Sequence, residues 1–141
     1  MKFRVAQVWI LFIFLGTLVL QLALIAFSYQ REAIYADDLR DLVVRFLAVY
    51  SMPLGVVISG IFAKAAAPDR LAPERAFWVA IGLAMMWNLL ILGRTLLFTF
   101  SANDRVTALV EYIDAVVGAS SFLTVAALTY FFTTDQEGKT P

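Results

Sequence analysis

The stretch VAQVWILFIFLGTLVLQLALIAFS, residues 5–28, contains no charged side chain. A helix of about 20 apolar residues crosses the roughly 30 Å hydrocarbon core of a bilayer, so this stretch predicts a membrane-spanning helix. It follows Lys2 and Arg4, as the apolar part of a secretory signal does. However, its apolar run is longer than that of a signal peptide, and no A-x-A-like cleavage site follows it. We therefore expect a retained membrane anchor.

Three further segments of the chain are apolar and long enough to span a bilayer, namely residues 38–66, 73–100 and 104–133. Lipid offers no partners to backbone N–H and C=O groups, so all four segments should be helices. The connections between them are short and leave no room for a soluble domain. We expect an all-α integral membrane protein in which residues 1–141 form one transmembrane domain, with four transmembrane helices in an antiparallel up-down-up-down bundle and a short disordered tail at 134–141.

The composition excludes several classes of function. Hydrophobic residues make up 62% of the 141-residue chain, and 11 basic side chains balance 11 acidic ones. The absence of a basic excess disfavours nucleic-acid binding. The chain has no cysteine and no histidine, and it carries no nucleophile-elbow, zinc-protease, P-loop or dinucleotide-binding motif. We therefore expect a non-enzymatic protein without catalytic, cofactor-binding or metal-binding residues.

The distribution of lysine and arginine predicts the orientation of the chain. Positive residues favour the cytoplasmic side of a membrane protein. If both termini face the cytoplasm, that side holds Lys2, Arg4, Lys64, Arg70, Arg75 and Lys139, and the loops and span ends on the opposite side hold Arg31, Arg40 and Arg105. We therefore expect a multi-pass protein of the plasma membrane or the bacterial inner membrane, with cytoplasmic N- and C-termini.

Four charged residues lie inside the apolar segments, namely Arg45, Arg94, Glu111 and Asp114. A charge at the centre of a span costs at least about 2.5 kcal/mol on insertion scales, so embedded charges usually pair or contact water. Their similar depth predicts one intramembrane charge cluster. It is either an ion-pair cluster that only fixes helix register, or a hydrated vestibule in which the two acids attract cations or exchange protons.

Polar and small residues form stripes along the predicted helices. At 100° per residue, Glu111 and Asp114 share one face of the fourth helix with Gly118 and Ser121. Such stripes serve either helix packing or a solute pathway. Pro53 lies within the second span, where it should kink the helix. The residues we assign to a polar packing or pathway face are Gln21, Ser59, Asn88, Thr95, Gly118 and Ser121.

Three functions agree with these features. One is a homo-oligomer with a channel-like ion pathway, which has to form between protomers because a single four-helix bundle fills its own interior. Another is an accessory, scaffold or sensor subunit of a larger membrane complex. The third is a small transporter, for which clear internal repeats are expected. We expect lateral assembly in the lipid bilayer, with copies of itself or with other membrane subunits, and an ion pathway as the leading mechanism.

Overall fold

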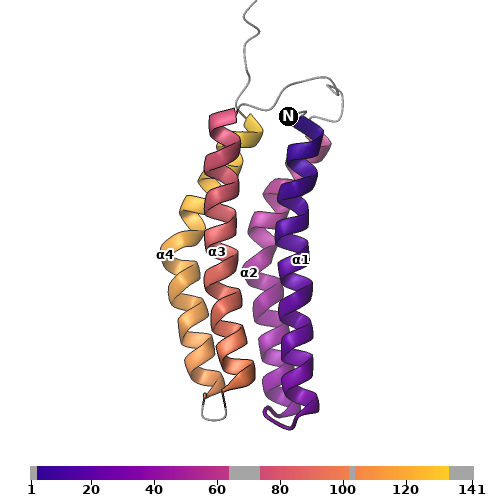
Figure 1. Ribbon diagram of the computed structural model, residues 1–141, viewed down its shortest axis with the longest axis vertical. Helices are drawn as coiled ribbons and strands as arrows, with labels where there is room; N and C mark the ends of the chain where they lie inside the picture. Colours follow the sequence, from indigo (N-terminus) through magenta and orange to yellow (C-terminus); the bar gives the residue numbers. More distant parts are fainter. Residues whose placement is uncertain (1–2, 64–73, 102–103, 134–141) are drawn as a thin grey trace, which may run out of the picture.

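The computed structural model describes residues 3–63, 74–101 and 104–133 of the chain. These residues form four α-helices: α1 (Phe3–Gln30), α2 (Ala36–Ala63), α3 (Glu74–Phe100) and α4 (Val106–Thr133) (Figure 1). All four are long and apolar enough to cross a membrane. The prediction of an all-α membrane protein with four such helices is therefore confirmed.

Where the structure describes them, four helix ends differ from the predicted bounds by two residues, and the ends at Phe100 and Thr133 agree with them. The first helix is longer at both ends than the predicted range 5–28, and the fourth begins at Val106 instead of residue 104. Helix ends depend on capping contacts that hydropathy does not report. The predicted ends at residues 64–66 and 73, and the tail at 134–141, lie outside the described residues.

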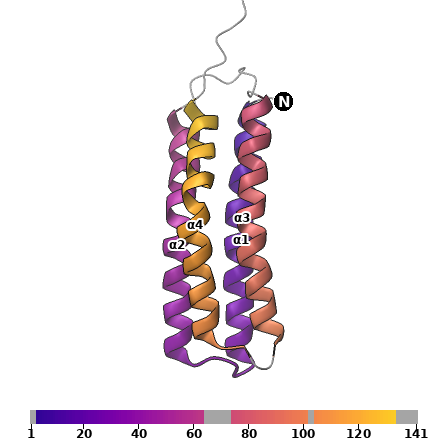
Figure 2. The ribbon, with the colours of Figure 1, turned by 90° about the vertical axis from the view of Figure 1, so that its left-hand side faces the viewer.

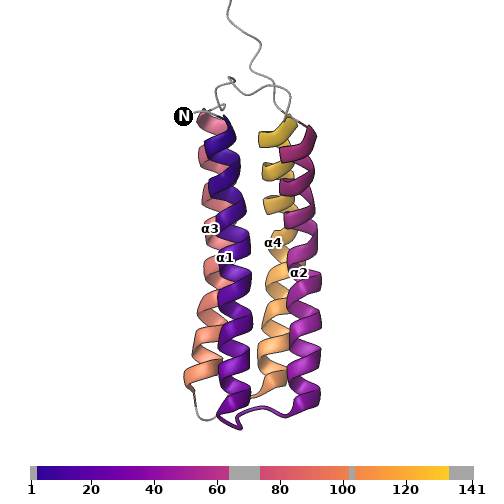
Figure 3. The same cartoon turned by 90° about the vertical axis from the view of Figure 1, so that its right-hand side faces the viewer.

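The four helices lie side by side, each close to two others. Helix α1 packs against α2 and α3, and α4 packs against the same two helices from the opposite corner. Figures 1, 2 and 3 show that helices consecutive in the chain run in opposite directions. The end of the bundle that holds residues 31–35, Ser101 and Asp104 is called the turn end below.

The C-terminus of α1 is closed by a Schellman motif. The amide of Ala33 donates to the Ser28 carbonyl and the amide of Glu32 donates to the Tyr29 carbonyl, both at 3.0 Å. Glu32 occupies the left-handed position of the motif with φ 58°, which glycine normally takes. The motif reverses the chain sharply, so α2 begins at Ala36 beside the end of α1.

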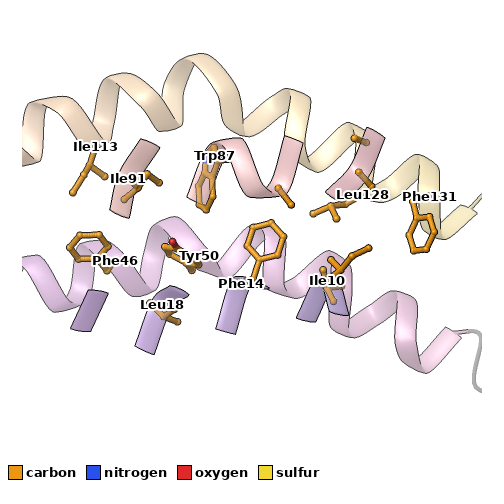
Figure 4. Packing of buried hydrophobic residues seen from close by; sticks show 14 of the residues in the cluster. Ile10, Phe14, Leu18, Phe46, Tyr50, Trp87, Ile91, Ile113, Leu128 and Phe131 are labelled. Atoms are coloured by element: carbon orange, nitrogen blue, oxygen red, sulfur yellow. The ribbon is translucent and has the colours of Figure 1, made fainter. Parts of the chain in front are cut away.

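Large apolar side chains fill the space between the helices. Trp87 of α3 and Tyr50 of α2 meet near the middle, with ring centroids 5.0 Å apart, and Phe14 of α1 packs against both rings. Figure 4 shows Phe46 and Ile113 on one side of this group and Leu128 and Phe131 on the other. All of these side chains are buried. The core is therefore a continuous column of packed side chains along the bundle axis.

Candidate functional site

Arg45 of α2 and Asp114 of α4 form an ion pair on the outside of the bundle. The Arg45 Nη1 atom lies 2.6 Å from each carboxylate oxygen of Asp114. The pair is open to the surroundings, with the arginine side chain 32% and the aspartate side chain 54% exposed. It joins two helices that are far apart in the sequence but neighbours in space. The Arg45 Nε atom is buried and has no hydrogen-bond acceptor within the described part of the chain.

Arg94 forms a different pair. Its guanidinium donates two hydrogen bonds to Asp104, from Nη1 to Oδ2 and from Nη2 to Oδ1, the second at 2.8 Å. The structure therefore does not gather the four predicted charges into one cluster. It forms the pairs Arg45–Asp114 and Arg94–Asp104 and leaves Glu111 exposed, without an ion pair among the described residues.

The position of Asp104 explains this difference. The sequence analysis placed this residue at the start of the fourth helix, whereas α4 begins two residues later, at Val106. Asp104 thus lies in the link at the turn end, where a long arginine side chain from the last two turns of α3 reaches it. Bidentate binding to the Arg94 guanidinium lowers the pKa of the Asp104 carboxyl, and a hydrogen bond from the Arg105 amide acts in the same direction.

A chain of hydrogen bonds crosses the middle of the bundle. The Gln21 amide Nε2 on α1 donates to the Tyr50 hydroxyl on α2 at 2.7 Å, and this hydroxyl donates to Asn88 Oδ1 on α3 at 2.9 Å. The Asn88 Nδ2 atom donates to the carbonyl of Ala84 at 2.7 Å. These side chains are buried. Two of the predicted polar residues, Gln21 and Asn88, therefore connect helices of this chain.

The hydrogen bond from Asn88 to Ala84 fixes which groups donate and which accept in this series of hydrogen bonds. A carbonyl only accepts hydrogen bonds, so the Asn88 amide turns its nitrogen to Ala84 and its oxygen to Tyr50. Tyr50 then donates to Asn88 and is left to accept from Gln21. As a result, Gln21 Oε1 is a buried acceptor without a donor in the part of the chain that the structure describes. Trp87 Nε1, beside this network, is a buried donor without an acceptor among the same residues. Sequence analysis did not single out Tyr50, although it shares a four-residue spacing with the buried residues Leu42 and Phe46.

Two further interhelical contacts lie nearer the ends. The Ser28 hydroxyl on α1 is 3.3 Å from the Thr99 hydroxyl on α3, and Gln7 Nε2 on α1 donates to the Gly60 carbonyl on α2 at 3.3 Å. The predicted residue Thr95 is also buried, and its hydroxyl donates to the Ile91 carbonyl of its own helix at 2.9 Å. The inner polar residues of α1 and α3 thus belong to helix packing.

The other predicted polar residues lie on the outside. Ser59 and Gly118 are exposed and Ser121 is half-buried. Since Asp114 shares its side of α4 with Gly118 and Ser121 and reaches Arg45 on α2, this side of α4 flanks the contact with α2. We call the outer surface formed by Arg45, Ser59, Asp114, Gly118 and Ser121 the α2/α4 seam.

Gly55 and Ser59 lie four residues apart on α2 and do not bring the described helices together. Both are exposed, and a Cβ atom added to Gly55 meets nothing within 4 Å. The close approach occurs at Gly60 instead, where an added Cβ lies 2.8 Å from Cε1 of Phe132 and nearer still to two other ring carbons.

Helix α2 continues from Ala36 through Pro53 to Ala63, so the proline does not end the helix, and the kink stays a prediction.

These features define a membrane protein with four hydrophobic helices, a packed interior and a polar outer seam. No group of three or more carboxylates suited to a metal ion occurs within residues 3–63, 74–101 and 104–133. No protein-family model matches the chain, and neither a curated protein nor a solved structure was found that is similar to it.

Proposed function

We propose that this protein is a non-enzymatic membrane protein that assembles laterally into a homo-oligomer along the α2/α4 seam, and that ions pass between the protomers. The observation that carries the proposal is the exposed Arg45–Asp114 pair on a surface that otherwise faces lipid. The proposed orientation has both termini in the cytoplasm, and the excess of lysine and arginine on that side supports it.

The protomer interior offers no room for an ion pathway. Trp87, Tyr50, Phe14 and Phe46 are fully buried and occupy the space between the helices along the axis. Ion conduction needs a hydrated path lined by polar groups. Such a path therefore has to run along the outside of the bundle, where a second protomer closes it.

The depth of the Arg45–Asp114 pair supports a covered seam. Helix α4 has 28 residues and Asp114 follows its first residue, Val106, by eight positions. At 1.5 Å per residue the helix is about 42 Å long, so it extends about 6 Å beyond each side of a 30 Å hydrocarbon layer. Asp114 then lies about 6 Å inside the hydrocarbon layer. An ion pair exposed to acyl chains at this depth is unfavourable, whereas a partner protomer or water between protomers stabilises it.

The shape of the seam also favours contact with another helix. Gly118 of the seam and Gly55, which lies four residues before Ser59 on α2, are exposed, and a Cβ atom added to either glycine meets nothing within 4 Å. Small residues on membrane helices allow two backbones to approach closely. Gly16 of α1 is exposed in the same way, but it lies among large exposed side chains such as Phe12 and Val19, and α1 has no charged residue at this depth. The seam is therefore the surface on which we place the protomer contact.

The oligomeric state tests the proposal directly. The protein lacks cysteine, so a single introduced cysteine reports one position without background. Native mass spectrometry in detergent should show a homo-oligomer. Gly118→Cys protein in liposomes should form oxidative cross-links between protomers, whereas Val19→Cys, an exposed position at similar depth on α1, should not. A monomer that gains stability only with another membrane protein would support the accessory-subunit alternative and overturn ours.

The role of the acids is tested by ion flux. In liposomes, replacement of Glu111 by Gln together with Asp114 by Asn should lower cation flux or change its selectivity. The control is Asp38→Asn, which removes a carboxylate near the start of α2 and leaves the seam intact. Unchanged selectivity with a lower yield of folded oligomer would assign the two acids to assembly alone.

A further inference from the structure

A polar cavity lies at the turn end, away from the α2/α4 seam. It has a volume of about 200 Å³ and lies between the link that follows α1 and the carboxyl end of α3. Arg31 and Ala33 line it on one side. Thr99, Ser101 and Asp104 line it on the other. Because it lies at the end of two hydrophobic helices, it sits at the level where lipid headgroups meet the hydrocarbon layer.

One side of this cavity carries a positive charge, and the other side offers hydrogen-bond acceptors. Arg31 is exposed, and its Cζ atom lies 5.6 Å from the centroid of the Phe27 ring, a cation–π contact. The opposite side holds the Asp104 carboxylate, whose Oδ2 atom accepts one hydrogen bond from Arg94 and can accept another, and the carboxyl end of α3, whose carbonyl groups carry partial negative charge. A ligand that carries a negative and a positive group a few bonds apart would match both sides.

An apolar surface continues from the cavity toward the hydrocarbon layer. The rings of Phe27 on α1 and Phe100 on α3 lie 6.4 Å apart. Both are exposed, Phe100 to 66%, and Phe100 also lines the cavity. An acyl chain attached to a headgroup in the cavity would lie along these rings.

We propose that this cavity binds a phospholipid whose headgroup contains a phosphodiester and a primary ammonium group. Arg31 binds the phosphate oxygens, as guanidinium groups do in charge-assisted hydrogen bonds. The ammonium group donates hydrogen bonds to Asp104 and to the carbonyl groups at the end of α3. A trimethylammonium headgroup carries the same charge but has no N–H donor, so it satisfies only the phosphate half of the site.

Lipid retention in native mass spectra tests this site. The full-length protein is purified in detergent and given equal amounts of phosphatidylethanolamine and phosphatidylcholine. We expect one phosphatidylethanolamine to be retained preferentially, and Arg31→Gln to reduce its retention about tenfold, the effect of losing one charge-assisted contact. Arg40→Gln is the matched control, because Arg40 is also exposed near the turn end but does not line the cavity.

Two further comparisons separate a lipid site from a headgroup site. Glycerophosphoethanolamine, which has the headgroup without acyl chains, should bind much more weakly than the lipid. Phe100→Ala should weaken lipid binding, whereas Phe122→Ala, which truncates an equally exposed ring on α4, should not. Equal retention of the two lipids, equal effects of Arg31→Gln and Arg40→Gln, or equal binding of the free headgroup and the lipid would each overturn the proposal.

Discussion

Tyr50 and Asn88 meet in the bundle interior, where the Tyr50 hydroxyl donates a hydrogen bond to Asn88 Oδ1 at 2.9 Å. Both side chains are buried in helices that otherwise expose apolar residues to lipid. Hydrogen bonds between helices hold membrane proteins together where water-driven burial of apolar surface is absent. Because Gln21 on α1 binds the same hydroxyl, this one group sets the relative height of three helices.

Replacement of Tyr50 by Phe should destabilise the bundle while preserving its packing. The phenyl ring keeps the contacts with Trp87 and Phe14, but Asn88 Oδ1 loses its donor and Gln21 Nε2 loses its acceptor. We expect a loss of about 1 kcal/mol, since interhelical hydrogen bonds in membranes contribute about 0.6 to 2 kcal/mol. Unfolding in mixed detergent micelles measures the change. In a double-mutant cycle with Asn88→Leu, effects that add independently would contradict the proposed coupling.

Replacement of Gly60 by Ala should destabilise the bundle through a steric clash. The added methyl group would overlap the ring of Phe132, which packs against Phe3 and Phe131 and has little freedom to move. Overpacking of this kind costs about 1 to 3 kcal/mol. Gly82→Ala is the matched control, because Gly82 is an exposed glycine on α3, away from the seam, whose added methyl group enters open space. Thermal unfolding in detergent should separate the two variants, and equal unfolding temperatures would refute the clash.

The four spans could be predicted from the sequence because hydropathy is a property of each segment by itself. Residues that share a helical face, such as Asp114, Gly118 and Ser121, could also be grouped from their spacing. The pairing of Arg94 could not, because it depends on α4 beginning after Asp104.

Helical phase also does not tell which face meets which helix. Gln21 and Asn88 lie inside the bundle, whereas Ser59 and Gly118, which were assigned to the same polar face, lie outside. Only the packing of whole helices decides this difference. For the same reason the close approach at Gly60 was missed, since nothing in the local sequence distinguishes Gly60 from Gly55.

The Arg94–Asp104 pair should make stability depend on pH in the acidic range. The guanidinium lowers the pKa of the folded-state Asp104 carboxyl below its value in the unfolded chain, which is about 3.9. The stabilisation is therefore fully present above about pH 4 and is lost as the pH falls through the lower folded-state pKa. Asp104→Asn should lower stability by a constant amount between pH 5 and 8. The difference from the unmodified protein should shrink below pH 4, and a difference that persists in strong acid would argue against ionic pairing.

Replacement of Glu32 by Gly should stabilise the protein. Glu32 holds φ at 58° in the Schellman motif that ends α1, a conformation that costs a residue with a Cβ atom about 1 kcal/mol or more. Glycine adopts it without this cost but is more flexible in the unfolded chain, so the expected net gain is about 0.5 to 1 kcal/mol. Unfolding in mixed micelles measures the gain. Glu32→Ala also removes the charge but keeps the strain, so only the glycine variant should be more stable. An equal gain from both variants would assign the effect to charge.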